Sequence, residues 1–319
     1  ALRQVHSLRL SREVFDLVPS IGAYAIVLAV VAVTTFVALF GVRRLSVRIG
    51  AVVRPDARHV HERSTPTLGG VAMLLGVLAG MFTAWCMGSF DVVFNGSTEP
   101  LGLVLAALVI AGVGAIDDLR DVSAPAKVAG IVIAASVLVI SGISILVFRV
   151  PFAGVFVLST DWSYLLSVLW VVGMANAINL IDGLDGLAGG IVAIAAATFF
   201  LYAHELSGDG LLAAGNVGPL IAIVALGACI GFLPHNFHPA KIFMGDAGAL
   251  LLGLLMAAST MVVGGRTDRS YSGNSFFFFA PLLIPLVILG VPIIDTLFAI
   301  IRRARSRSGI SNADKGHLH

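Results

Sequence analysis

The stretch from Ile21 to Val42 reads IGAYAIVLAVVAVTTFVALFGV and contains no charged side chain. Runs of about 17–25 apolar residues cross a bilayer as α-helices. A single β-strand cannot do so, because lipid leaves its backbone N–H and C=O groups without partners. This stretch therefore predicts a transmembrane helix.

Further apolar runs of the same kind follow along the chain. We expect nine spans in all, at 21–42, 67–88, 100–116, 128–148, 162–180, 187–204, 216–234, 247–264 and 276–301. Of the 319 residues, 58% are hydrophobic and 12% are charged, whereas a soluble domain has about twice that charged fraction. The mean hydropathy of +0.99 points the same way. The composition predicts an all-α, polytopic transmembrane helical bundle that forms one membrane domain over residues 1–319, with no cleavable signal peptide.

Basic residues divide unevenly between the two sides of this predicted bundle. One side carries fourteen Lys and Arg residues: Arg43, Arg44, Arg48, Arg54, Arg58, Arg63, Arg120, Lys127, Lys241, Arg302, Arg303, Arg305, Arg307 and Lys315. The other side, which holds the N-terminus, carries six: Arg3, Arg9, Arg12, Arg149, Arg266 and Arg269. The positive-inside rule places the first side in the cytoplasm. We therefore expect a multi-pass protein of the inner or plasma membrane whose N-terminus is outside and whose His319 is inside.

The first two inner loops carry polar groups next to helix ends. Basic and hydroxyl side chains lead up to Gly69-Gly70 at a helix start, and helix N-termini favour phosphate; an ordinary positive loop before a capped helix is the alternative. Asp117 and Asp118 stand at the C-terminal end of a helix, with Lys127 nine residues after Asp118. Two carboxylates at the negative pole of a helix dipole are unfavourable unless a cation offsets them. Such a conflict often marks a functional site, although a solvated turn is the alternative.

In the third inner loop, Asn179, Asp182 and Asp185 are spaced three residues apart. If the segment is helical, neighbouring members lie on one face. No basic residue lies nearby, so a bound metal would neutralise the two carboxylates, and oxygen ligands suit magnesium. The alternative is an acidic helix N-cap.

The last two inner segments add amides, rings and cations. Asn236, Phe243 and Asp246 lie within eleven residues of each other, a set suited to a nucleobase together with a metal. Asp246 is placed to start the eighth span, where helix capping is its alternative role. The final segment begins with Arg302-Arg303-Ala-Arg305-Ser-Arg307, whose arginines alternatively anchor the helix to anionic headgroups.

All five polar groups fall on one membrane side by a topology argument that did not use them. The set lacks a Walker A loop, a zinc pattern and a serine nucleophile motif. It favours an enzyme over a transporter, because transporters place substrate sites near the bilayer midplane. A non-catalytic scaffold would leave the one-sided carboxylates unexplained.

These motifs resemble the polyprenyl-phosphate N-acetylhexosamine-1-phosphate transferase family. The residues that carry the resemblance are Asp117-Asp118, Asn179-Leu-Ile-Asp182-Gly-Leu-Asp185-Gly, Phe243-Met-Gly-Asp246-Ala-Gly and Gly316-His-Leu-His319, and it extends from Thr65-Pro-Thr-Leu-Gly-Gly70 to the last residue. The histidine motif resembles the branch that uses UDP-N-acetylglucosamine (UDP-GlcNAc) more than the branch that uses UDP-MurNAc-pentapeptide. The family has ten to eleven spans and a further histidine, so we expect this chain to be truncated at its C-terminus.

The resemblance implies transfer of GlcNAc-1-phosphate from UDP-GlcNAc to undecaprenyl or decaprenyl phosphate, with UMP as the leaving group. This would be the first membrane step of cell-envelope polysaccharide synthesis, and transfer of phospho-MurNAc-pentapeptide is the alternative. The implied cofactor is Mg²⁺, with Mn²⁺ as a substitute. The implied partners are the two substrates, the lipid bilayer and a second copy of the chain; we expect no nucleic acid.

The family motifs also imply a role for each matching residue. The metal ligands are Asp246 and Asn179. The catalytic residues are Asp117, Asp118, Asp182 and His317. The substrate-binding residues are Lys127 at the pyrophosphate, Asp185, Asn236 and Phe243 at the uridine, and Arg303 and His319. We expect the lipid phosphate to attack the β-phosphorus directly with Asp117 or Asp118 as general base, and a two-step route through an aspartyl intermediate stays open.

Overall fold

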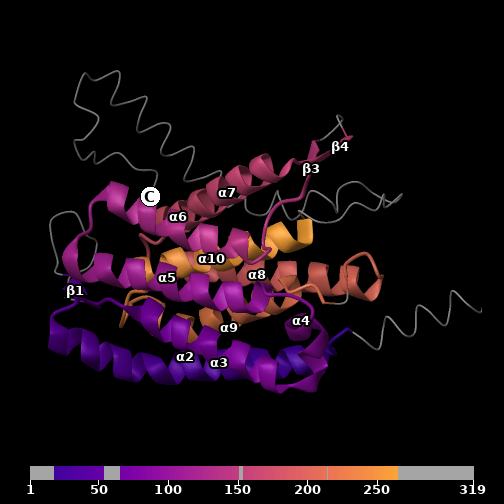
Figure 1. Ribbon diagram of the computed structural model, residues 1–319. Helices are drawn as coiled ribbons and strands as arrows, with labels where there is room; N and C mark the ends of the chain where they lie inside the picture. The colour runs from indigo at the N-terminus through magenta and orange to yellow at the C-terminus, as the bar shows by residue number, and fades with distance from the viewer. Residues whose placement is uncertain (1–17, 54–64, 151–153, 214, 265–319) are drawn as a thin grey trace, which may run out of the picture.

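The structure is a computed structural model that describes residues 18–53, 65–150, 154–213 and 215–264 (Figure 1). The ninth predicted span, 276–301, lies outside these residues. Within them the chain forms nine α-helices, with a 3-10 turn at Gly88–Phe90 and two short two-stranded sheets. The helices are α2 (Ile21–Ile49), α3 (Gly69–Cys86), α4 (Asp91–Asn95), α5 (Glu99–Arg120), α6 (Ala124–Ile140), α7 (Thr160–Ile181), α8 (Leu187–Gly208), α9 (Gly218–Asn236) and α10 (Gly245–Gly264).

The first eight predicted spans are confirmed as helices. Seven of the helices are long and apolar enough to cross a membrane, namely α2, α3, α5, α7, α8, α9 and α10. The predicted span 128–148 is wrong at its C-terminal end, because α6 stops at Ile140. There the N–H groups of Gly142 and Ile143 return to the carbonyls of Val139 and Leu138, and Gly142 takes a φ of 105° that closes the helix.

Two hairpins connect helices at opposite ends of the bundle. Strands β1 (Val52–Val53) and β2 (Thr65–Pro66) pair antiparallel between α2 and α3. Strands β3 (Val147–Val150) and β4 (Gly154–Val157) pair antiparallel between α6 and α7, with Val147 opposite Val157. β-branched and aromatic residues such as those of β3 and β4 favour extended backbone over helix.

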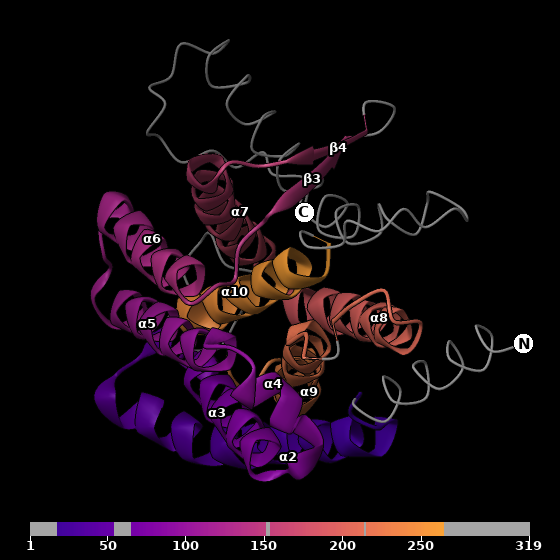
Figure 2. The ribbon, with the colours of Figure 1, turned by 45° about the vertical axis from the view of Figure 1, so that its right-hand side comes forward.

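Helix α10 is the centre of the bundle. Figure 2 shows it in the middle of the helices, and it contacts α3, α5, α7 and α9. Nearly every one of its side chains is buried. Small residues allow this close packing: a β-carbon on Gly70 of α3 would overlap the backbone of Gly248, and one on Gly253 would overlap Ala175 of α7.

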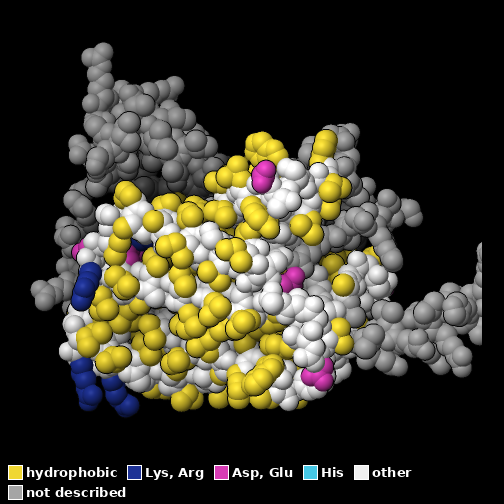
Figure 3. Space-filling view, in the orientation of Figure 1, with side chains coloured by type: hydrophobic (Ala, Val, Ile, Leu, Met, Phe, Trp, Pro, Cys, Tyr) yellow, Lys and Arg dark blue, Asp and Glu magenta, His cyan; other side chains and the backbone are white. Residues whose placement is uncertain are grey.

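The outer surface of the bundle is apolar along its length. Figure 3 shows hydrophobic side chains over the middle, with Lys and Arg gathered at the end that carries β1. The outward face of α2 exposes Val33 by 61% and Val37 by 59%. Exposed apolar side chains in such a continuous band are suited to lipid rather than to water. The chain is thus a polytopic membrane bundle.

Candidate active site

The end of the bundle that carries β1 also holds the polar residues that the sequence singles out. Asp117 and Asp118 lie in the last turn of α5, and Lys127 lies in the first turn of α6 after a short connection. Asp246 lies in the first turn of α10, as predicted. Because α5 packs along α10, residues separated by more than a hundred positions meet there.

Asp118 caps the N-terminus of α10 from a neighbouring helix. Its Oδ1 accepts a hydrogen bond from the backbone N–H of Asp246 at 2.9 Å, and its Oδ2 accepts one from Ala247 at 3.2 Å. The first N–H groups of a helix have no partner within the helix, and a carboxylate there is also favoured by the dipole. Gly245 permits this approach, because it has a φ of 67° and a β-carbon on it would collide with the Asp118 carboxylate.

Lys127 bridges two carboxylates. Its Nζ lies 2.5 Å from Oδ2 of Asp117 and also forms an ion pair with Oδ2 of Asp246. The remaining oxygen of Asp117 accepts the backbone N–H of Val122 at 2.6 Å. The three charged side chains are between 11% and 22% exposed. Lys127 is the cation that offsets Asp117, whereas the N–H groups at the start of α10 offset Asp118, so tertiary contacts resolve the conflict seen in the sequence.

Asp182 lies just after α7, where it is the C-cap residue. Burial and the nearby charges of Asp118, Asp246 and Asp185 raise the pKa of its carboxyl to about 7. The helical arrangement considered for Asn179, Asp182 and Asp185 is wrong, because only Asn179 lies within the helix. The alternative of an acidic helix N-cap is wrong as well, because Gly186 is the N-cap residue of α8. Asn179 is half-buried one turn before Asp182.

Asp185 and Asn236 tie together the two loops that flank this cluster. Asn236 is 2% exposed; its Oδ1 accepts the N–H of Gly186 at 2.8 Å and its Nδ2 donates to the carbonyl of Ile242 at 3.0 Å. Oδ2 of Asp185 accepts the N–H of Ala240 at 3.0 Å and lies 2.9 Å from Nδ1 of His238. The amide of Asn236, which we expected to contact uridine, is thus buried, and both of its polar atoms already bond to backbone groups.

Phe243 and the Gly69-Gly70 helix start belong to one backbone junction. The N–H of Phe243 donates to the carbonyl of Pro66, and the carbonyls of Phe243 and Met244 accept the N–H groups of Gly69 and Gly70 at 2.9 and 2.8 Å. The first two N–H groups of this helix therefore have protein partners and are not available to the phosphate that the sequence suggested.

Some of the predicted site residues cannot be placed and one partner was missed. Arg303, His317 and His319 lie outside the described residues. His238 was assigned no role from the sequence, yet it contacts the almost buried Asp185 while its own side chain is 79% exposed. Its signal was its position in the same inner loop as Asn236 and Phe243.

The oxygen atoms at this end fit a magnesium ion in part. Asp117 and Asp246 contact Lys127, and Asp118 holds the backbone beside Asp246. Burial first, and then the charges of Asp118, Asp246 and Asp185, raise the pKa of Asp182. In the part of the chain that the structure describes, no three His, Cys, Asp or Glu side chains converge enough to hold an ion by themselves. Magnesium is usually bound by one or two carboxylates, with water and substrate phosphate completing its shell. The carboxylate of Asp246 is suited to such an incomplete set, and the role of Asn179 stays a prediction.

The fold and this cluster define a membrane-embedded transferase. The chain belongs to glycosyl transferase family 4, whose family model matches residues 100–264, the segment from α5 to α10 that holds the whole carboxylate–lysine cluster.

Individual relatives share most of the chain. It is 41% identical over 296 residues to the decaprenyl-phosphate N-acetylglucosaminephosphotransferase of Mycobacterium tuberculosis (strain ATCC 25618 / H37Rv), which covers 90% of this chain and 72% of that protein. It is 38% identical over 278 residues to a Bacillus subtilis (strain 168) protein named "Probable undecaprenyl-phosphate N-acetylglucosaminyl 1-phosphate transferase", with 87% and 71% covered. It is 34% identical over 277 residues to the phospho-N-acetylmuramoyl-pentapeptide-transferase of Desulforudis audaxviator (strain MP104C), with 80% and 75% covered.

Proposed function

We propose that this protein transfers GlcNAc-1-phosphate from UDP-GlcNAc to polyprenyl phosphate, giving polyprenyl-diphosphate-GlcNAc and UMP. The observation that carries the proposal is the Asp117–Lys127–Asp246 cluster at one end of a lipid-facing bundle. Relatives named as N-acetylglucosaminephosphotransferases support this donor, since their identity of 41% exceeds the 34% of the phospho-N-acetylmuramoyl-pentapeptide-transferase. The high similarity to a decaprenyl-phosphate enzyme supports a long prenyl acceptor.

The reaction exchanges one phosphorus–oxygen bond for another. A phosphate oxygen of the lipid forms a bond to the β-phosphorus of UDP-GlcNAc, and the bond from that phosphorus to the bridging oxygen breaks. UMP leaves with the bridging oxygen and the bonding electrons. Transfers of this type need alignment and neutralisation of charge more than covalent help from the protein. The direct attack needs no enzyme-bound intermediate, and trapping of a phospho-sugar adduct on an aspartate would favour the two-step route instead.

Each residue of the cluster has a separate task in this proposal. Lys127 neutralises charge on the pyrophosphate, because it is the cation of this cluster and lies between Asp117 and Asp246. Asp117 faces the acceptor phosphate and takes its proton if the acceptor arrives protonated. Asp118 positions Asp246, because both of its oxygens hold the start of α10.

A magnesium ion would be held by Asp246 and Asn179, with Asp182 nearby. When bound, it supplies a Lewis acid that offsets charge on the pyrophosphate oxygens. Asp185 and Asn236 then act on the donor by fixing the loops around Gly186 and Ala240. The roles expected for Arg303, His317 and His319 stay predictions.

The membrane orientation is part of the proposal. The β1 end of the bundle would face the cytoplasm, where UDP-sugars are made, and the N-terminus would be outside. The lipid acceptor reaches the same end from the bilayer, because its phosphate stays at the interface while its prenyl chain stays in the hydrocarbon. The clustering of Lys and Arg at that end supports this orientation (Figure 3).

The test is UMP release by the purified 319-residue chain with UDP-GlcNAc, polyprenyl phosphate and Mg²⁺. Release that requires both lipid and metal, and that Asp246→Asn abolishes, supports the proposal. Asp209→Asn is the matched control, because Asp209 is an exposed acid that caps the far end of α8. Release with UDP-MurNAc-pentapeptide alone would assign the protein to the other branch, and release from neither donor by folded protein would refute the transferase proposal.

A further inference from the structure

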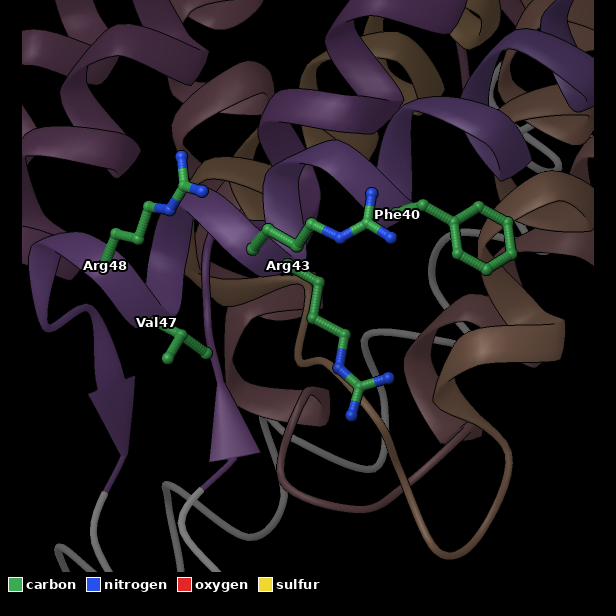
Figure 4. A pocket seen from close by; sticks show the side chains of 5 residues that line it. Phe40, Arg43, Val47 and Arg48 are labelled. Carbon is green, nitrogen blue, oxygen red and sulfur yellow. The ribbon is translucent and has the colours of Figure 1, made fainter.

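The end of α2 carries three arginines around a hollow that the carboxylate–lysine cluster does not use. Arg43, Arg44 and Arg48 line it together with Phe40 and Val47, and its volume is about 450 Å³ (Figure 4). Helix residues three or four positions apart lie on the same face, so the five side chains form one side of the last turns of α2. This side lies beyond the apolar run that ends at Val42.

The three guanidinium groups have no acidic partner in the described part of the chain. The ion pairs found there join Lys127 to Asp117 and Asp246, and His238 to Asp185. All three arginines are exposed. Three like charges within six residues repel each other, and the helix dipole offsets only those near the C-terminus. An anion in the hollow would remove this repulsion, and guanidinium groups match phosphate geometry.

The rest of the hollow and the surface below it are apolar. Phe40 is 49% exposed and Val47 58% exposed, and the outward face of α2 continues through Val37 and Val33. The other side of α2 packs on α3 and α9. A ligand that fits both surfaces has an anionic head and hydrocarbon chains, which a soluble anion lacks.

We propose that this hollow binds an anionic phospholipid of the surrounding bilayer. Its headgroup phosphate is held by Arg43, Arg44 and Arg48, and its acyl chains lie along the exposed face of α2. A general attraction of basic residues to a charged membrane needs no hollow, whereas here a hollow lined by three arginines and an exposed ring offers a headgroup a place to sit.

The hollow is also joined to the loops around the candidate active site. The ring of Phe40 lies 4.9 Å from the ring of His235, which is 6% exposed. The next residue, Asn236, holds the backbone of Gly186 and Ile242. A lipid seated against Phe40 therefore stabilises the packing of His235 and, next to it, the hydrogen bonds of Asn236. We expect bound lipid to raise the unfolding temperature of the protein.

Native mass spectrometry of the full chain in detergent tests the site, with phosphatidylglycerol or phosphatidylcholine added at equal concentrations. We expect one molecule of phosphatidylglycerol to be retained in clear preference to phosphatidylcholine. A basic residue near an anionic headgroup changes affinity by about fivefold. Each single Arg→Gln variant should therefore weaken retention by about fivefold, and the triple variant by roughly a hundredfold. Arg120→Gln is the matched control, since Arg120 is an exposed arginine in the last turn of another helix, α5.

A second measurement follows unfolding with and without phosphatidylglycerol, which detects a variant that has failed to fold. Stabilisation of the wild type and of Arg120→Gln, but not of the folded triple variant, supports the site. Equal retention of the two phospholipids by the wild type, or an unchanged preference in the triple variant, overturns it. The proposal would also be overturned if the triple variant lost polyprenyl phosphate binding but retained phosphatidylglycerol, because the hollow would then bind the acceptor.

Discussion

Asp118→Asn separates a positioning role from a direct role for the two adjacent aspartates. The carboxylate of Asp118 accepts two backbone N–H groups at the start of α10, at 2.9 and 3.2 Å. Asparagine keeps one acceptor oxygen and turns an N–H₂ group toward the other donor. The change therefore loses one charge-assisted hydrogen bond, leaves one partly buried N–H without a partner and removes a charge favoured by the dipole.

The expected cost follows from these losses. A hydrogen bond to a charged group contributes about 1.5–3 kcal/mol, and removal of an N-cap side chain costs about 0.5–2 kcal/mol. We expect Asp118→Asn to lower the free energy of unfolding by about 2 kcal/mol, which corresponds to a fall in Tm of roughly 4–8 °C by the scaling known for domains of 150–250 residues. The activity should fall with it, because Asp246 begins the same helix.

Asp117→Asn is the comparison. Its asparagine can still accept the N–H of Val122, and what it loses is a partly exposed ion pair with Lys127, which contributes about 1 kcal/mol or less. Thermal unfolding of both variants and UMP release at a temperature well below both Tm values distinguish the roles. The capping role of Asp118 is refuted if its variant unfolds at the wild-type temperature, or if Asp117→Asn is the less stable of the two.

Four further predictions concern other residues of the same end. Lys127→Met should lower kcat for UMP release by about 10²–10³-fold, as for loss of a positioned charge stabiliser, and Lys127→Arg should recover part of it; wild-type rates in the Met variant would exclude the role. The pKa of Asp182 is raised to about 7 from an ordinary 3.8, so the folded protein holds a proton that the unfolded chain releases, and stability is lost as pH rises from about 4 through 7. Without divalent ions, the free energy of unfolding should fall less between pH 5 and 8 in Asp182→Asn than in the wild type. An equal fall in the two proteins would contradict this. Gly70→Ala should cost roughly 3 kcal/mol or prevent folding because its β-carbon overlaps the backbone of α10, whereas Gly41→Ala, which meets open space, should leave Tm unchanged or higher. Asn236→Ala leaves the partly buried N–H of Gly186 and the buried C=O of Ile242 without partners, so it should cost about 2 kcal/mol of stability. It should also raise KM for UDP-GlcNAc more than it changes kcat, and a wild-type KM would show that substrate binding does not depend on these two hydrogen bonds.

Hydropathy alone was sufficient to predict where the membrane helices lie. The apolar run 247–264 corresponds closely to α10 (Gly245–Gly264). The run 21–42 begins with α2, but the helix continues past it to Ile49. A bilayer imposes this simplicity, because only a helix satisfies its own backbone in lipid. The end of α6 at Ile140 could not be predicted in this way, because the apolar run continues through residues 141–148. The helix ends there because the backbone turns at Gly142.

The residues of the cluster were also predicted from the sequence, because carboxylates at helix ends are conspicuous in so apolar a chain. Knowing which residues belong to the cluster does not show which atoms each of them contacts. Asp118 and Asp246 are 128 residues apart, and no local pattern distinguishes a carboxylate that caps a distant helix from one that faces a substrate. The need of Asp117 and Asp118 for a cation was visible in the sequence, whereas the contact of Lys127 with Asp246 depends on how α6 and α10 meet.

The sequence by itself determined the membrane class, the helices and the end of the bundle at which polar chemistry gathers, because these depend on composition and on spacing along one chain. Only the tertiary structure decided which polar atoms stay available. The N–H groups of Gly69 and Gly70 and the amide of Asn236 look suited to ligands in the sequence, but backbone groups of other loops and of the same loop occupy them. A buried donor or acceptor takes whichever partner packing brings to it, and that partner is decided by the way the helices assemble.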